Sequence, residues 1–262
     1  MRRYLTLLWT QLRVSAAQAM AYRANFVLSG VMAFAQIALT LIPLIVLFDR
    51  RHQVGDWTAP DMLVVVAYFV AIKAILEGVI SPSMQDLVQR IRDGSFDYIL
   101  LKPIDAQAMI SASRYEPWSL FDLLGAIAIA VFAFIHRGHA PDALAIAAGL
   151  GLFVAGVIAM YSLWIAVAAA AFWIGRLDNL QYLLGAMFDT ARWPVQVFPT
   201  VWRTVFTFLI PVAIMTTFPA MALLGRLDLR TAVATIAGAL VMLVLSRLVW
   251  RAAIRNYTSA SS

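Results

Sequence analysis

The stretch 143–174 reads ALAIAAGLGLFVAGVIAMYSLWIAVAAAAFWI and contains no charged residue. A helix needs about 20 predominantly apolar residues to cross the hydrocarbon core of a membrane. Within lipid, a helix also satisfies its own backbone hydrogen-bonding groups, which an open irregular segment does not. The stretch therefore predicts a membrane-spanning helix.

The composition of the whole chain extends this prediction. Of the 262 residues, 63% are hydrophobic and 13% are charged, and the mean hydropathy is +0.83. Soluble domains carry about 45–50% apolar and about 25% charged residues. So few charges cannot cover the surface of a soluble domain, so we predict an all-α membrane protein. The absence of cysteine excludes disulfides and thiolate metal sites.

Four other stretches approach the same standard, namely 26–48, 61–80, 119–135 and 231–249. A further apolar stretch, 201–224, is interrupted by Pro211 and Pro219, and 177–193 is moderately apolar but carries three charged residues. Residues 1–25 combine an apolar stripe at helical spacing with polar residues elsewhere. This pattern favours an amphipathic helix lying along the membrane surface over a cleaved signal peptide.

Basic residues predict the orientation, because cytoplasmic loops are enriched in lysine and arginine. With the amino terminus inside, the inner segments hold twelve basic residues and the outer segments hold seven. Both termini are therefore expected in the cytoplasm, with six crossings. Either 201–224 spans the membrane, or 177–193 spans it and 200–225 enters the outer leaflet as a re-entrant pair of helices.

The longest predicted inner loop, 81–117, is expected to contain a short helix. The run 81–83 is predicted to end the second span, with Ser83 as the N-cap of a helix over 84–93 and Gly94 at its carboxyl end. A short, charged, amphipathic helix between two spans suits docking into a groove of a soluble partner. A solvated connector would have the same local features.

Three parts of the chain resemble ABC-2 type permeases, and more narrowly a bacterial subfamily of uncharacterised ABC transport permeases. The run 91–104, IRDGSFDYILLKPI, resembles the cytoplasmic loop of these proteins. The run 192–199, RWPVQVFP, looks like the aromatic-Pro-x-x-x-aromatic-Pro element at the outer end of their fifth span. Its matching residues are Arg192, Trp193, Pro194, Phe198 and Pro199. The surroundings of Pro211 and Pro219 resemble the re-entrant region before the family's last span.

The resemblance implies a type V exporter-like architecture. A six-span domain would cover 26–249, with a cytoplasmic coupling loop at 81–117, a re-entrant region at 200–225 and a cytoplasmic tail at 250–262. It favours 177–193 as the fifth span. The residues that would contact the ATPase are Gln85, Asp86, Leu87, Val88, Gln89, Arg90, Ile91, Arg92, Asp93, Gly94, Ser95, Phe96 and Asp97. The implied partners are two copies of a cytoplasmic ATPase, a second permease that is either identical or a sister chain, and membrane lipid.

Charged groups at membrane depth cost a few kcal/mol unless they face protein or water. Lys73 and Glu77 in the second span are four residues apart, so they share a helix face and can pair. Together with Gln36 in the first span, they are candidates for a translocation path or gate. A structural ion pair and a helix–helix hydrogen bond are the simpler interpretations of these residues.

The chain lacks a Gly-x-x-x-x-Gly-Lys-Ser/Thr phosphate loop, so ATP and magnesium are expected on the separate ATPase. No catalytic constellation, metal site or nucleic-acid site is predicted. We expect the permease subunit of an exporter in the bacterial cytoplasmic membrane, moving a hydrophobic or amphipathic compound such as a drug, antibiotic or lipid. The alternatives are an ATP-independent secondary carrier and a membrane scaffold or assembly factor.

Overall fold

The computed structural model describes residues 10, 11, 13–15, 17, 23–111, 113–174, 184–209 and 211–257. Most of the predicted amphipathic helix over 1–25 lies outside these residues, as does the 175–183 part of the predicted fifth span. Within the described ranges, five helices are long and apolar enough to cross a membrane: Phe26–Arg50, Ala59–Arg92, Ser119–Arg137, Ala143–Trp173 and Leu229–Arg255. They coincide with the five long apolar stretches of the sequence, so the protein is a multi-pass, all-α membrane protein.

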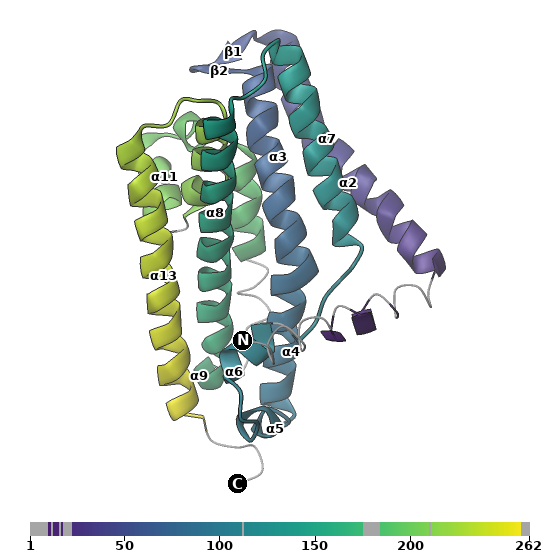
Figure 1. Cartoon of the computed structure of the whole chain (residues 1–262), viewed down its shortest axis with the longest axis vertical. Helices are drawn as coiled ribbons and strands as arrows, with labels where there is room; N and C mark the ends of the chain where they lie inside the picture. The colour runs from purple at the N-terminus through teal and green to yellow at the C-terminus, as the bar shows by residue number, and fades with distance from the viewer. Residues whose placement is uncertain are drawn as a thin grey trace.

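The long helices stand side by side in a bundle (Figure 1). They are α2 (Arg23–Arg50), α3 (Ala59–Ile75), α7 (Ser119–Arg137), α8 (Ala143–Ala169) and α13 (Leu229–Arg255). The closest pairs are α3 with α7 and α8 with α13, whereas α2 packs mainly on α7 at the edge. A hairpin of β1 (Gln53–Val54) and β2 (Trp57–Thr58) lies at one end of the bundle, and α5 (Asp97–Leu100) lies at the other (Figure 1).

Side-chain caps set where three of these helices begin at the hairpin end. The Thr58 hydroxyl accepts a hydrogen bond from the Asp61 backbone N–H, and the Asp61 carboxylate accepts one from the Thr58 backbone N–H. Asp142 and Asp228 cap α8 and α13 in the same position. The first N–H groups of a helix have no partner within the helix, and such a cap stabilises by about 1 kcal/mol.

Asp61 also ties together three parts of the hairpin end. Its side chain is only 1% exposed, with Arg226 Nη2 at 2.9 Å from Oδ2 and Arg137 Nε at 3.5 Å from Oδ1. A buried carboxylate is tolerated when opposite charges and hydrogen bonds compensate its lost hydration. The start of α3, the end of α7 and the loop before α13 are therefore joined at one residue.

The second span does not end where the sequence predicts. Helices α3, η1 (Leu76–Ile80) and α4 (Ser81–Arg92) form one continuous helix, in which η1 is a π-helical turn. The prediction that 81–83 ends the span is therefore wrong. The predicted N-cap at Ser83 is also wrong, because Ser83 lies within α4 and its hydroxyl donates to the Arg114 carbonyl at 3.1 Å. The predicted carboxyl end agrees, because Gly94 adopts φ 75° just after α4.

Pro82 does not break this helix because a neighbouring segment replaces the donor that proline lacks. In an α-helix, the Gly78 carbonyl would accept from residue 82, which here has no N–H. It accepts instead from the Glu116 N–H at 2.8 Å. The Ser81 N–H bonds to the Leu76 carbonyl five residues back, which closes the π turn.

The described residues between 189 and 223 form short helical pieces. They are η2 (Asp189–Arg192), η3 (Val195–Val197), α11 (Thr200–Thr204), η4 (Val205–Leu209), η5 (Ala213–Thr217) and α12 (Phe218–Leu223). Pro194 and Pro199 directly precede η3 and α11, where a missing N–H leaves no intrahelical bond unmade. Pro219 lies inside the continuous helix Ala213–Leu223. The region 201–224 is thus two pieces flanking Pro211. Whether 177–193 is a span stays a prediction.

The close approach of α7 to η1 makes Gly78 sensitive to substitution. A Cβ atom there would lie 2.1 Å from Ser119 Oγ and 2.7 Å from Ser119 Cβ, whereas a Cβ at Gly151 in α8 meets nothing within 4 Å. We expect Gly78→Ala to destabilise the protein by about 1–3 kcal/mol through overpacking. Gly151→Ala is the matched control and should be neutral or stabilising by about 0.5–1 kcal/mol.

Thermal unfolding of the two variants in detergent measures this difference. Adding Ser119→Gly to Gly78→Ala should restore part of the lost stability, because it removes both clashing atoms. Equal unfolding temperatures for Gly78→Ala and Gly151→Ala would contradict the tight approach of α7 to η1.

Candidate functional site

The end of the molecule opposite the hairpin contains α4, α5 and α6 (Ala106–Ser111) (Figure 1). The predicted coupling residues 85–97 occupy α4 and the turn into α5. Among them, Gln85, Gln89, Arg92 and Asp93 are exposed, whereas Leu87, Val88 and Phe96 are buried. Asp86 and Arg90 form an ion pair along α4 at 2.7 Å. Only part of the predicted set is therefore available to a partner.

Phe96 anchors the turn between α4 and α5 to the bundle. Its ring centroid lies 5.3 Å from that of Phe172, 6.2 Å from Trp250 and 5.5 Å from Tyr257, each in an edge-on arrangement. Such pairs contribute about 0.5–1.5 kcal/mol each beyond the area they bury. The partners come from α9 (Ala171–Ile174), from α13 and from the residues just after α13. The turn is thus attached to the end of the last long helix.

A polar network attaches the following segment to two long helices. Arg247 of α13 forms a bidentate ion pair with Asp105 and donates to Gln107 Oε1 at 2.6 Å. Gln107 donates to Tyr161 Oη of α8 at 2.9 Å, and that hydroxyl lies 2.7 Å from Ser111 Oγ. Bidentate arginine–carboxylate pairs are among the strong hydrogen-bonded contacts in proteins. The network therefore holds α6 against both α8 and α13.

Beyond these contacts, the segment 96–111, which we call the tip, presents apolar side chains to its surroundings. Tyr98 is 71% exposed and Leu101 is 80% exposed, while Ile99 between them is buried. Exposed apolar groups on a fixed scaffold mark a contact surface. Neither residue is in the predicted coupling set, although both lie within the run 91–104. The signal that would have identified them is the apolar sequence YILL in a loop expected to face water.

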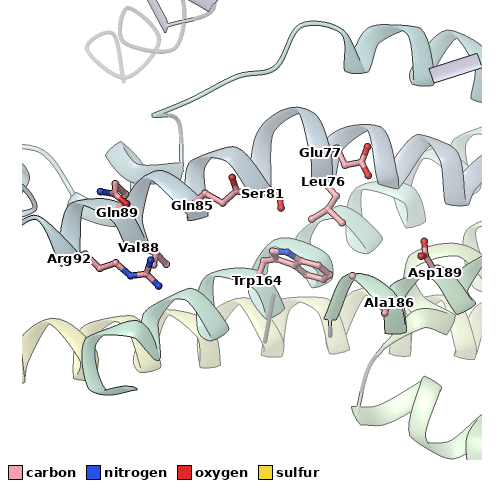
Figure 2. A pocket seen from close by; sticks show the side chains of 11 residues that line it. Leu76, Glu77, Ser81, Gln85, Val88, Gln89, Arg92, Trp164, Ala186 and Asp189 are labelled. Atoms are coloured by element: carbon pink, nitrogen blue, oxygen red, sulfur yellow. The ribbon is translucent and has the colours of Figure 1, made fainter. Parts of the chain in front are cut away.

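A groove of about 650 Å³ runs along η1 and α4 (Figure 2). One helix face lines it at nearly four-residue intervals, through Leu76, Glu77, Ser81, Gln85, Val88, Gln89 and Arg92. Trp164 of α8 and residues Gly185, Ala186 and Asp189 complete the lining. Figure 2 shows Glu77 and Asp189 toward one end, Arg92 toward the other, and Trp164 between them. Six of the eleven lining residues are polar or charged, so the groove suits a ligand that carries polar groups beside an apolar part.

The predicted pair in the second span forms and borders this groove. Lys73 Nζ lies 3.5 Å from Glu77 Oε1, and Glu77 is one of the lining residues. Gln36 is exposed on α2 and is not among the lining residues. The structure thus brings Lys73 and Glu77 together but leaves Gln36 apart. Their role in transport stays a prediction.

The predicted outer motif holds the segment 184–199 against the bundle. The Arg192 guanidinium lies 5.8 Å from the centroid of the Phe69 ring on α3 and 3.9 Å from Asp189. Phe69 in turn stacks on Phe188 at 5.2 Å. Further along, Phe198 packs edge-on against Phe206 of η4 at 5.1 Å. Within the described residues, the motif makes packing contacts rather than a polar site.

These features define a helical, multi-pass membrane protein whose second span continues unbroken into an anchored, water-facing tip. A sequence model of the ABC-2 family transporter proteins matches residues 34–261. The chain therefore belongs to the ABC-2 transporter family, as the run 91–104 predicts, and it is a membrane permease of an ABC transporter. Neither a curated protein nor a solved structure matches the chain.

The Asp105–Arg247 pair gives a prediction with a pH signature. We expect Asp105→Asn and Arg247→Gln each to lower the unfolding temperature, because each variant loses the ion pair. The exchanged variant, Asp105→Arg with Arg247→Asp, should recover part of the loss. Protease cleavage within 97–111 should follow the same order.

Hydrogen bonds from Arg247 hold the pKa of Asp105 below its usual range. The stabilisation is thus complete above the ordinary carboxyl pKa of about 3.9 and is lost as pH falls below it. The difference in unfolding temperature between wild-type protein and Asp105→Asn should begin to narrow below about pH 4 and close only as pH falls through the lowered pKa of Asp105. A difference that persists in acid would contradict a contribution from this ionised carboxylate.

Proposed function

We propose that this chain is the permease subunit of an ATP-driven exporter in the bacterial cytoplasmic membrane. Its substrate is a hydrophobic or amphipathic compound that leaves the cytoplasm or the inner leaflet. Two permeases, identical or sister chains, assemble with two copies of a cytoplasmic ATPase that binds ATP and magnesium. Family membership supports the ATPase partner, because ABC permeases work with such a chain.

The unbroken helix Ala59–Arg92 is the observation that carries this proposal. Its middle lines the groove at Glu77, and its end leads into the exposed tip at Tyr98 and Leu101. The helix runs without a break through the π turn at η1 and through Pro82, so its covalent and hydrogen-bonded continuity links the tip to the groove. A force on the tip therefore moves the groove wall.

ATP acts in this scheme by changing which arrangement of the spans is favoured. A partner shifts a two-state equilibrium only through a difference in its binding to the two states. The tip is held to α13 by Phe96 and to α8 by the Gln107–Tyr161 bond. An ATPase that moves the tip thus moves three long helices, which opens the groove toward the outer side.

The second candidate is an ATP-independent carrier. Such a carrier needs ion-coupling carboxylates at membrane depth, and Glu77 and Asp189 line one groove. In this alternative, the tip would be a connector without a transport role. The two functions differ in what the tip binds and in what drives flux.

Co-purification from the native membrane tests the exporter. We expect an ATPase to accompany the permease in mild detergent, as identified by mass spectrometry. Tyr98→Ser with Leu101→Ser should reduce its recovery more than tenfold, because burying each side chain contributes about 1.5–3 kcal/mol. The matched control is Leu144→Ser with Leu229→Ser, two equally exposed apolar residues at the hairpin end, 77% and 79% exposed.

Failure to recover any ATPase, under conditions that keep other ABC complexes intact, would overturn the exporter. The carrier would then be favoured if reconstituted protein moved substrate down an ion gradient without ATP and Glu77→Gln abolished that flux. Equal loss of ATPase in the tip variant and in the control would show that the tip is not the docking surface.

A further inference from the structure

A second cavity, of about 600 Å³, opens at the hairpin end of the bundle. It shares no lining residue with the groove along η1 and α4. Its walls are the hairpin residues 54–57, then Gln196, Val197 and Arg203, and finally Met221 and Arg226. Three segments that are distant in the sequence therefore meet around one space. Nothing in the transport scheme above uses it.

Positive charge exceeds negative charge around this cavity. Arg226 is held in place by Asp61 at 2.9 Å and by a hydrogen bond to the Asp56 carbonyl at 3.2 Å. Arg137 shares the Asp61 carboxylate, so two guanidinium groups already neutralise it. Arg203 adds a third positive charge. The Asp56 side chain is the single carboxylate among the lining residues.

Arg203 and Arg226 keep hydrogen-bond donors available for a ligand. Arg203 donates to the Gln196 carbonyl at 2.9 Å and forms no ion pair within the part of the chain that the structure describes. A guanidinium carries five N–H donors, and neither arginine uses more than a few of them here. Because the guanidinium fork matches two oxygens of a phosphate, the pair of arginines suits a phosphate group.

Exposed apolar side chains precede Arg203 on the same short helix. Val201 is 74% exposed and Trp202 is 52% exposed in α11, and Val197 of the cavity wall is also exposed. Tryptophan is enriched at the membrane–water boundary, where its ring meets both phases. At the hairpin end α3, α8 and α13 begin and α2 and α7 end, so this end lies near one membrane surface (Figure 1).

We propose that this cavity binds the phosphate head group of a lipid-like amphiphile. The phosphate lies on Arg203 and Arg226, and the apolar tail extends over Val197, Val201 and Trp202. The site is separate from the groove at Glu77 and does not depend on ATP coupling. A phospholipid of the surrounding leaflet and free phosphate would share the head-group chemistry, so the experiment distinguishes them.

Native mass spectrometry of the delipidated protein, titrated with dioleoyl phosphatidylglycerol, tests the site. Arg203→Gln should weaken binding of the first lipid roughly tenfold or more, because it removes charged hydrogen bonds to phosphate. Arg230→Gln is the matched control, since Arg230 is exposed at the same end of the molecule but does not line the cavity. Equal effects of the two variants, or no effect of either, would overturn the proposal.

Two further measurements identify the source of the phosphate. Val201→Ser should weaken phosphatidylglycerol binding severalfold and leave the protein folded, because this side chain already faces outward. Inorganic phosphate should displace the lipid only at a concentration at least a hundredfold higher than that of competing lipid. If phosphate competes as well as the lipid does, or if Val201→Ser binds like wild type, the tail contributes nothing and the amphiphile proposal fails.

Discussion

The hydrogen bond from the Glu116 N–H to the Gly78 carbonyl is the contact on which the inner half of the molecule depends. Without it, Pro82 would leave a carbonyl unsatisfied inside the protein, at a cost of about 1–3 kcal/mol, and the helix would tend to break there. The missing side chain of Gly78 lets Ser119 come close enough for the bond to form. Because the helix stays whole, the groove wall and the tip are joined by one continuous element.

Two contacts of different physical character then restrain the tip. The aromatic cluster around Phe96 depends on packing and tolerates small adjustments of the rings. The Asp105–Arg247 pair depends on direction, because a bidentate fork holds only one geometry. A motion that preserves both must carry α13 along with α4. In the proposed scheme, this restraint would let a force on the tip reach the long helices.

The sequence predicts what local composition determines and misses what distant partners determine. The five long helices follow from hydropathy, because lipid requires a continuous apolar stretch. The Lys73–Glu77 pair follows from helical spacing. The predicted end of the second span is wrong. Pro82 locally favours a helix break, but Glu116, a residue in another segment, donates to the carbonyl that proline leaves without a partner. The Asp105–Arg247 pair joins residues 142 positions apart, which no local pattern reveals.

The partners of each carboxylate distinguish charges that are compensated within the fold from charges that solvent or a ligand can reach. Asp61 is 1% exposed, caps a helix and has arginines at 2.9 Å and 3.5 Å, so its charge is compensated within the fold, although Oδ1 accepts no hydrogen bond from the described residues. Glu77 and Asp189 have only a lysine at 3.5 Å and an arginine at 3.9 Å, and both face the groove. Incompletely compensated charges at membrane depth are costly unless water or a ligand reaches them. The Glu77 and Asp189 side chains are 47% and 48% exposed, so solvent or a ligand reaches them, whereas the Asp61 side chain, at 1%, is enclosed by the fold.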